Sequence, residues 1–141
     1  MPSAGSPDDL LAAALAARER TYSPYSGYAV GAALRDEHGR VHAGANVENA
    51  AYPQSQCAEA SAIGVLVAAG GRRITEALVI ADGSLGLPSP CGACRQRLRE
   101  FMPLDAQVHL AGLAGVIRTV TLGELLPLSF GPEFLLTETP R

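Results

Sequence analysis

The sequence predicts an α/β sandwich built around one mixed sheet of about five strands. Short apolar runs that are typical of strands alternate along the chain with segments rich in good helix formers. A composition of 48% hydrophobic and 18% charged residues is that of a compact globular protein. The length of 141 residues suits one core, and we therefore expect a single domain over residues 1–141.

The first predicted element is a helix over about residues 7–20. Ser6 offers a hydroxyl cap, Pro7 occupies the first helical position, and two acids, Asp8 and Asp9, face the positive end of the helix dipole. A Pro- and Gly-containing stretch then ends the helix. We expect a β-hairpin next, and its strands are predicted over residues 29–35 and 41–46.

The second half of the chain alternates helices with strands. The expected elements are a helix over 57–69, a strand over 77–81, a loop over 82–90, a helix over 91–101, strands over 107–111 and 116–121, and a short last helix. Gly70 is a typical signal for the end of the first of these helices, and Pro103 stops the second. Thr121 and Glu124 have the spacing of a capping box.

Composition excludes several classes of function. The net charge is −3 and no stripe of Lys or Arg is present, so we expect no nucleic-acid partner. No apolar stretch approaches the roughly 20 residues that span a bilayer, and the first residues do not resemble a secretory signal. We expect a cytoplasmic protein without a membrane segment. Three cysteines, an odd number, suit a reducing compartment and a metal better than disulfides.

The three cysteines lie in two compact strings, Cys57-Ala58-Glu59 and Pro90-Cys91-Gly92-Ala93-Cys94, and both strings fall at predicted helix starts. Cys91 and Cys94 share one face of a helical turn. Cys57 and Glu59 do not share a face, but both can serve a metal that lies just beyond the helix N-terminus. Three thiolates leave one coordination position of zinc open, and a nearby carboxylate can move protons, so the strings predict hydrolytic chemistry.

Other interpretations of the cysteines stay open. Any one cysteine alone is more often a small buried apolar residue than a ligand. The Cys91/Cys94 pair also fits a thioredoxin-like redox motif, although that interpretation leaves Cys57 and Glu59 without a purpose. A closed structural zinc site would need a histidine as its fourth ligand: His38, His42 or His109. The first lies in a predicted turn and the others in predicted strands, which does not favour this alternative.

A wider set of motifs accompanies the cysteine strings. They are the segments 25–34 and 46–52, Arg95-Gln96 after the second string, and the segments 124–127 and 130–133. With its ligand-x-Glu and Pro-Cys-x-x-Cys strings, the chain resembles the small zinc-dependent cytidine deaminases. The resemblance implies a three-layer α-β-α sandwich, one Zn²⁺ per chain and hydrolytic deamination of cytidine or deoxycytidine. It also implies a small pyrimidine nucleoside as the substrate and assembly as a homotetramer with sites completed across subunits.

The resemblance also implies a role for each site residue. The metal ligands would be Cys57, Cys91 and Cys94, and the zinc would activate a water that attacks C4 of the pyrimidine. Glu59 would be the catalytic residue, because it would carry the proton of that water to N3 and then to the leaving ammonia.

Substrate contacts are implied for six residues: Asn46, Glu48, Tyr28, Ala58, Ser89 and Phe130. The N–H of Ala58 would donate to the base carbonyl, and the carbonyl of Ser89 would steer the departing amine. Asn46 and Glu48 alternate on an extended segment and would face the ribose hydroxyls, although a solvated loop acid is the alternative for Glu48. Tyr28 occupies the place of a base-stacking Phe, and Phe130 would reach a neighbouring subunit's site. Both could instead be core aromatic residues.

The chain departs from the family pattern at Ala60, where most small cytidine deaminases have an arginine that donates to the zinc-ligand sulfurs. We hypothesise that Arg95, Gln56 or the helix dipoles take over part of that task. The segment 53–56 is also unusual, and Tyr28 adds a hydroxyl beside the base. Blasticidin S deaminases share the metal site and lack the arginine, so a modified cytosine nucleoside such as an aminonucleoside antibiotic is an alternative substrate. A non-enzymatic nucleoside-binding module would not need Glu59.

Overall fold

The computed structural model of the protein describes residues 7–136, and its centre is a five-stranded sheet with the order β2-β1-β3-β4-β5. The strands are β1 Val30–Asp36, β2 Val41–Ala45, β3 Ile74–Ala81, β4 Gln107–Gly112 and β5 Gly115–Thr121. Strands β3 and β4 run parallel, whereas the other neighbouring pairs are antiparallel. The predicted mixed sheet of five strands is therefore confirmed.

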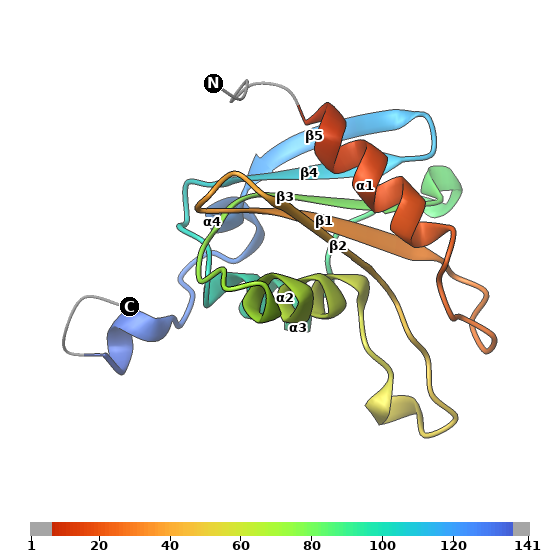
Figure 1. Cartoon of the computed structure of the whole chain (residues 1–141), viewed down its shortest axis with the longest axis horizontal. Coiled ribbons are helices and arrows are strands. Elements are labelled where there is room, and N and C mark those ends of the chain that lie inside the picture. The colour runs from red at the N-terminus through yellow and green to blue at the C-terminus, as the bar shows by residue number, and fades with distance from the viewer. Residues whose placement is uncertain (1–6, 137–141) are drawn as a thin grey trace.

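Helices cover both faces of this sheet. They are α1 Asp8–Arg18, α2 Ala58–Ala68, α3 Gly92–Arg99 and α4 Leu122–Leu125, and single 3₁₀ turns lie at Tyr52–Gln54, Gly83–Leu85 and Pro132–Phe134. Helix α1 lies on one face, and α2 and α3 lie on the other (Figure 1). This arrangement confirms the three-layer sandwich. None of the helices in residues 7–136 is long and apolar enough to cross a membrane.

Most predicted elements are found within a few residues of their expected ends. The hairpin, both helices with a leading cysteine and the capping box of Thr121 and Glu124 are confirmed, whereas Ser6, the predicted cap of α1, lies outside the described residues. Strand β3 begins at Ile74, three residues before the predicted start. The polar residues Thr75 and Glu76 do not resemble the start of a buried strand in the sequence. Glu76 is nevertheless buried, because its carboxylate is paired with Arg35 of β1 and His109 of β4.

Two apolar cores fill the spaces between the layers. The larger one lies between the sheet and the helices α2, α3 and α4, and the smaller one lies between the sheet and α1. Two glycines let helices approach the sheet backbone. A Cβ at Gly44 of β2 would lie 2.6 Å from the backbone N of Ala62 in α2, and one at Gly31 of β1 would lie 2.1 Å from the carbonyl O of Ala14 in α1. Helix α2 is thus seated directly on the sheet, which fixes where its first turn lies.

Candidate active site

The two cysteine strings meet where α2 and α3 begin. Cys57 is the N-cap residue of α2, Cys91 is the N-cap residue of α3, and Cys94 lies fully buried in the first turn of α3. Their three Sγ atoms all lie within 4.8 Å of one another. Sulfurs that share a tetrahedral zinc at about 2.3 Å lie about 3.8 Å apart, so the cluster has the size that one ion needs.

The thiols carry electrostatic costs that a metal ion would offset. Burial raises the pKa of Cys94 and, less strongly, that of Cys57. Burial acts in the same direction on Cys91, but hydrogen bonds from the backbone N–H and thiol of Cys94 lower its pKa below the ordinary value. Three thiolates in one small space repel one another, and a bound dication offsets this repulsion. The donor set therefore fits zinc in both its geometry and its charge.

The histidines lie outside this cluster. His42 contacts the carboxylate of Asp36 at 2.8 Å, and His109 contacts Glu76 at 2.6 Å. His38 is exposed in the hairpin turn and lies 3.9 Å from Glu37. Among the described residues, the three cysteines form the group of potential ligands close enough to share an ion, and no histidine belongs to it. The alternative of a closed site with a histidine as its fourth ligand is therefore wrong.

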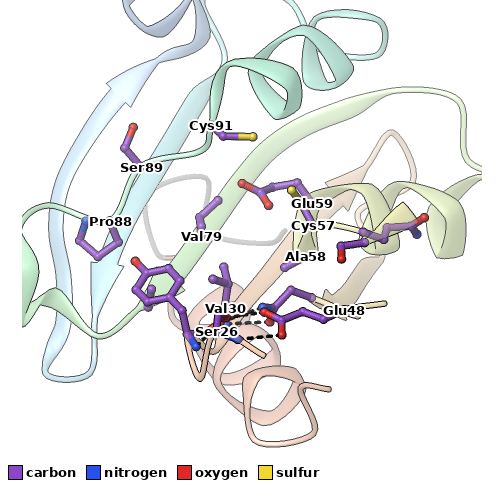
Figure 2. A pocket seen from close by; sticks show the side chains of 15 residues that line it. Ser26, Val30, Glu48, Cys57, Ala58, Glu59, Val79, Pro88, Ser89 and Cys91 are labelled. Carbon is purple, nitrogen blue, oxygen red and sulfur yellow. Dashed lines mark hydrogen bonds between the residues drawn. The ribbon is translucent and has the colours of Figure 1, made fainter. Parts of the chain in front are cut away.

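Glu59 lies beside the sulfurs in the first turn of α2. Its side chain is only 3% exposed, and burial raises its pKa above the ordinary value. Figure 2 shows Glu59 next to Cys57 at the start of α2, with Cys91 nearby on the segment that leads into α3. A buried carboxyl group whose pKa is raised holds a proton more readily near neutral pH. It has the property that a proton carrier needs.

A cavity of about 330 Å³ opens beside the cluster, which is within the range of small-molecule sites. The structure brings five of the six predicted substrate-binding residues into its lining: Tyr28, Asn46, Glu48, Ala58 and Ser89. They share this lining with Cys57, Glu59 and Cys91. Two apolar residues that the sequence analysis did not identify, Val30 and Val79, line it as well, because alternate positions of β1 and β3 face this side of the sheet.

Glu48 is held by the loop that precedes β1. One carboxylate oxygen accepts hydrogen bonds from the backbone N–H groups of Tyr25 at 2.9 Å and Ser26 at 3.1 Å, and the other accepts from the Ser26 hydroxyl. The Ser26 hydroxyl is the main cause of the lowered pKa of Glu48. The sequence analysis did not identify Ser26, since nothing links it to a residue 22 positions away. These contacts fix the orientation of the Glu48 carboxylate at the cavity.

Asn46 has a similar fixed orientation. Its side-chain oxygen accepts from the N–H of Val30 at 3.0 Å, and its amide nitrogen donates to the carbonyl of Tyr28 at 2.8 Å. These bonds tie the extended segment after β2 to the segment that leads into β1. The tyrosine, which is 41% exposed, is thereby held at the cavity.

The loop that carries Ser89 is anchored by Arg95 of α3. Its guanidinium donates to the carbonyl of Pro90 at 2.8 Å, to the hydroxyl of Ser89 at 2.7 Å and to the carbonyl of Leu125 at 2.8 Å. These hydrogen bonds go to oxygen atoms, so the hypothesis that Arg95 donates to the sulfurs is wrong. The amide of Gln56 donates to the Ser61 hydroxyl at 3.4 Å. Neither side chain fills the role of the missing arginine.

Phe130 lies apart from this cavity. It stacks on Phe134 with ring centroids 5.0 Å apart, and about half of it is exposed. Gln96 of α3 donates to the Phe130 carbonyl at 2.9 Å, which fixes the segment to the helix. In Figure 1 the C-terminal segment extends away from the sheet. The structure thus does not bring Phe130 together with the other predicted substrate contacts of the same chain.

The chain matches a known protein family over most of its length. The family model described as the cytidine and deoxycytidylate deaminase zinc-binding region matches residues 6–110, which include Glu59 and all three cysteines. The chain belongs to this deaminase family. Its fold and its cysteine cluster are thus those of a zinc-binding deaminase, a class of hydrolytic enzymes.

Individual deaminases are similar over most of their length. The cytidine deaminase of Halalkalibacterium halodurans is 44% identical over 124 residues, which are 88% of this chain and 93% of the relative. The crystal structure of cytidine deaminase from Burkholderia pseudomallei has a TM-score of 0.82 and 41% identity, and the match covers 89% of this chain and 99% of the other. The enzyme from Mycobacterium tuberculosis gives a TM-score of 0.76 at 36% identity, over 88% and 96% of the two chains.

Proposed function

We propose that the chain catalyses the hydrolytic deamination of cytidine and deoxycytidine to uridine and deoxyuridine, with release of ammonia. The observation that carries this proposal is the cluster of three cysteine sulfurs beside the buried Glu59, at a cavity of nucleoside size. The relatives over most of the chain are named cytidine deaminases, which supports the same substrates.

The metal ligands in this proposal are Cys57, Cys91 and Cys94. When bound, a zinc ion at this position supplies a Lewis acid that makes water a nucleophile near neutral pH. The protein contributes two helix N-termini that point their positive ends at the cluster and so reduce the cost of its negative charge. Because these ligands come from two helices, the relative position of α2 and α3 sets the shape of the site.

Glu59 would act as the proton carrier. It would accept one proton of the attacking water and deliver it to N3 of the pyrimidine, and it would then take the second proton from the resulting C4 hydroxyl and pass it to the leaving amino group, which departs as ammonia. Burial supports this role, because it raises the pKa of the carboxyl group and brings the protonated and ionised forms closer in free energy. The transfers balance, because one water adds and one ammonia leaves.

The remaining cavity residues would orient the nucleoside. The N–H of Ala58 lies in the first turn of α2, where helix geometry leaves it without an intrahelical acceptor, so it would donate to the base carbonyl. The carbonyl of Ser89 would accept from the departing amine. Asn46 and Glu48, which both line the cavity, would bind the ribose hydroxyls. Tyr28 would stack on the base.

We also propose that the enzyme is a cytoplasmic homotetramer in which Phe130 completes the site of a neighbouring subunit. Support comes from the exposed apolar residues of the C-terminal segment, which are Leu128, Phe130, Phe134 and Leu135. Such a patch is typical of a subunit interface. The three cysteines are free thiols, as expected in a reducing compartment. Sedimentation of the purified protein would measure the assembly.

The decisive test is an ultraviolet assay of the zinc-loaded protein on cytidine, deoxycytidine and substituted cytosine nucleosides, with ammonia measured in parallel. We expect turnover of both natural nucleosides at one zinc per chain. Preference for an aminonucleoside antibiotic would instead identify the alternative substrate. Binding of nucleosides without ammonia release would contradict an enzymatic function and would support a binding module.

A further inference from the structure

The cysteine cluster carries negative charge that needs compensation. Three thiolates around a dication leave a net charge of −1, and an ionised Glu59 beside them adds a second negative charge. Cys91 is exposed, but Cys94 is fully buried and Glu59 is 3% exposed, so water screens the charge of these two groups poorly. Position 60, which follows Glu59 in α2, is an alanine and supplies no cation. A side-chain cation that adds to the two helix dipoles must therefore come from another element.

Arg97 of helix α3 places a guanidinium beside the cluster. The Nη1 atom of Arg97 donates to the Sγ atom of Cys94 over 3.7 Å, a distance typical of a hydrogen bond to sulfur. The two residues are three positions apart, so they share one face of the helix. The positive charge of Arg97 also acts on Glu59, where it partly opposes the effect of burial on the pKa of the carboxyl group. One guanidinium thus interacts with both the thiol of Cys94 and the carboxyl group of Glu59.

The other arginines of α3 are engaged elsewhere. Arg95 donates to three oxygen atoms of the Ser89 loop and of α4. Arg99 donates to the hydroxyl of Ser129 and forms an ion pair with Glu133. Arg97 is not part of the cavity lining, so it approaches the sulfur from behind the site and leaves the space for substrate free.

We propose that Arg97 is a positioning residue that donates to the Cys94 thiolate and thereby supplies, from α3, the positive charge that Ala60 does not supply from α2. The proposal rests on the function proposed above only in taking zinc as the resident ion. Zinc binding displaces thiol protons and leaves the cluster more negative, so a nearby cation favours the loaded state. A donor to the thiolate also draws electron density from the sulfur and keeps the ion a stronger Lewis acid.

The test compares the full-length Arg97→Met variant with Arg97→Lys and with a matched control, Arg118→Met, which removes an exposed arginine of β5. Two readouts do not require turnover: zinc affinity in competition with a chelator, and the thiolate-to-metal charge-transfer band of the cobalt(II)-substituted protein. We expect Arg97→Met to lower zinc affinity about tenfold or more and to shift the band to lower energy. Arg97→Lys keeps the charge and should give intermediate values, whereas Arg118→Met should match the parent.

A second variant tests whether a cation from α2 can replace the cation from α3. Adding Ala60→Arg to Arg97→Met should restore the zinc affinity and the band position, because the cation then returns from α2. A parent-like spectrum and zinc affinity in Arg97→Met would overturn the proposal, as would equal losses in Arg97→Met and Arg118→Met. Melting temperatures of all variants separate these effects from loss of fold. Failure of the parent protein to deaminate nucleosides would contradict the proposed function but would leave these metal readouts interpretable.

Discussion

Two glutamates are buried on opposite faces of the sheet, and their surroundings differ. Glu76 of β3 faces α1, where one carboxylate oxygen accepts from Arg35 at 3.1 Å and the other contacts His109 at 2.6 Å. Glu59 lies on the α2 face beside cysteines and a cavity, and none of the ion pairs within the described chain includes it. Burial alone therefore does not single out a candidate proton carrier; a buried carboxyl group that also borders a cavity is the better candidate.

The largest expected effect is that of Glu59→Gln. This variant keeps the shape of the side chain but cannot carry a proton, so kcat for cytidine should fall about 10³-fold, equivalent to about 4 kcal/mol. The melting temperature should be equal to that of the parent or higher, because a buried ionisable group is removed. Steady-state kinetics and thermal unfolding measure both. Retention of more than a tenth of the activity would assign proton transfer to another group.

Glu76→Gln should lower stability and leave activity unchanged, which is the opposite of the result expected for Glu59→Gln. Removing this charge leaves His109 and Arg35 without their buried partner, so the free energy of unfolding should fall by about 3 kcal/mol. Activity per folded molecule should remain unchanged. Urea denaturation measures the loss. Asp9→Asn is the control, because Asp9 binds the same arginine at the exposed end of the network and should cost less than about 1 kcal/mol.

A third buried carboxyl group, that of Asp36, should make the stability of the fold depend on pH. Its burial raises the pKa, but hydrogen bonds from His42 and from the backbone N–H groups of Arg40 and His38 outweigh burial and hold the pKa well below the ordinary value. A lowered pKa in the folded state stabilises the protein above the unfolded-state pKa of about 4, and this contribution is lost as the pH falls below it. Asp36→Asn should therefore cost about 2 kcal/mol at pH 7 and less at pH 3.

Denaturant unfolding of the parent and of Asp36→Asn at both pH values measures this change. The exposed Asp105 provides a matched control, because Asp105→Asn should change the free energy of unfolding little at either pH value. An equal loss of unfolding free energy for Asp36→Asn at pH 7 and pH 3 would show that the charge of the carboxylate does not contribute to stability.

The smallest expected effect concerns Glu48, whose carboxylate is held by neutral donors alone. Ser26→Ala removes one of them, so KM for cytidine should rise about fivefold, equivalent to about 1 kcal/mol, with little change in kcat. Steady-state kinetics test this, with Ser84→Ala outside the cavity as the control. An unchanged KM would mean that the backbone N–H groups suffice to orient Glu48.

The sequence was sufficient for features that depend on local patterns. Strand and helix order follow from hydrophobic periodicity, and the meeting of Cys57 with the Cys91/Cys94 pair follows from their positions at two helix starts. Contacts between distant segments were not predictable in this way. Ser26 reaches Glu48 only because the sheet brings two loops together, and the choice between Arg95 and Arg97 depends on which way each guanidinium turns from α3.

The close seating of α2 on Gly44 has a consequence for how this scaffold can acquire new substrates. A methyl group at Gly44 would overlap the backbone of α2, so repacking beneath this helix cannot shift its first turn by small steps. Directed evolution is then confined to the segments that border the cavity from outside the core, namely residues 25–28, 53–56 and 82–90. These segments can vary in length and composition while the chemical centre keeps its geometry.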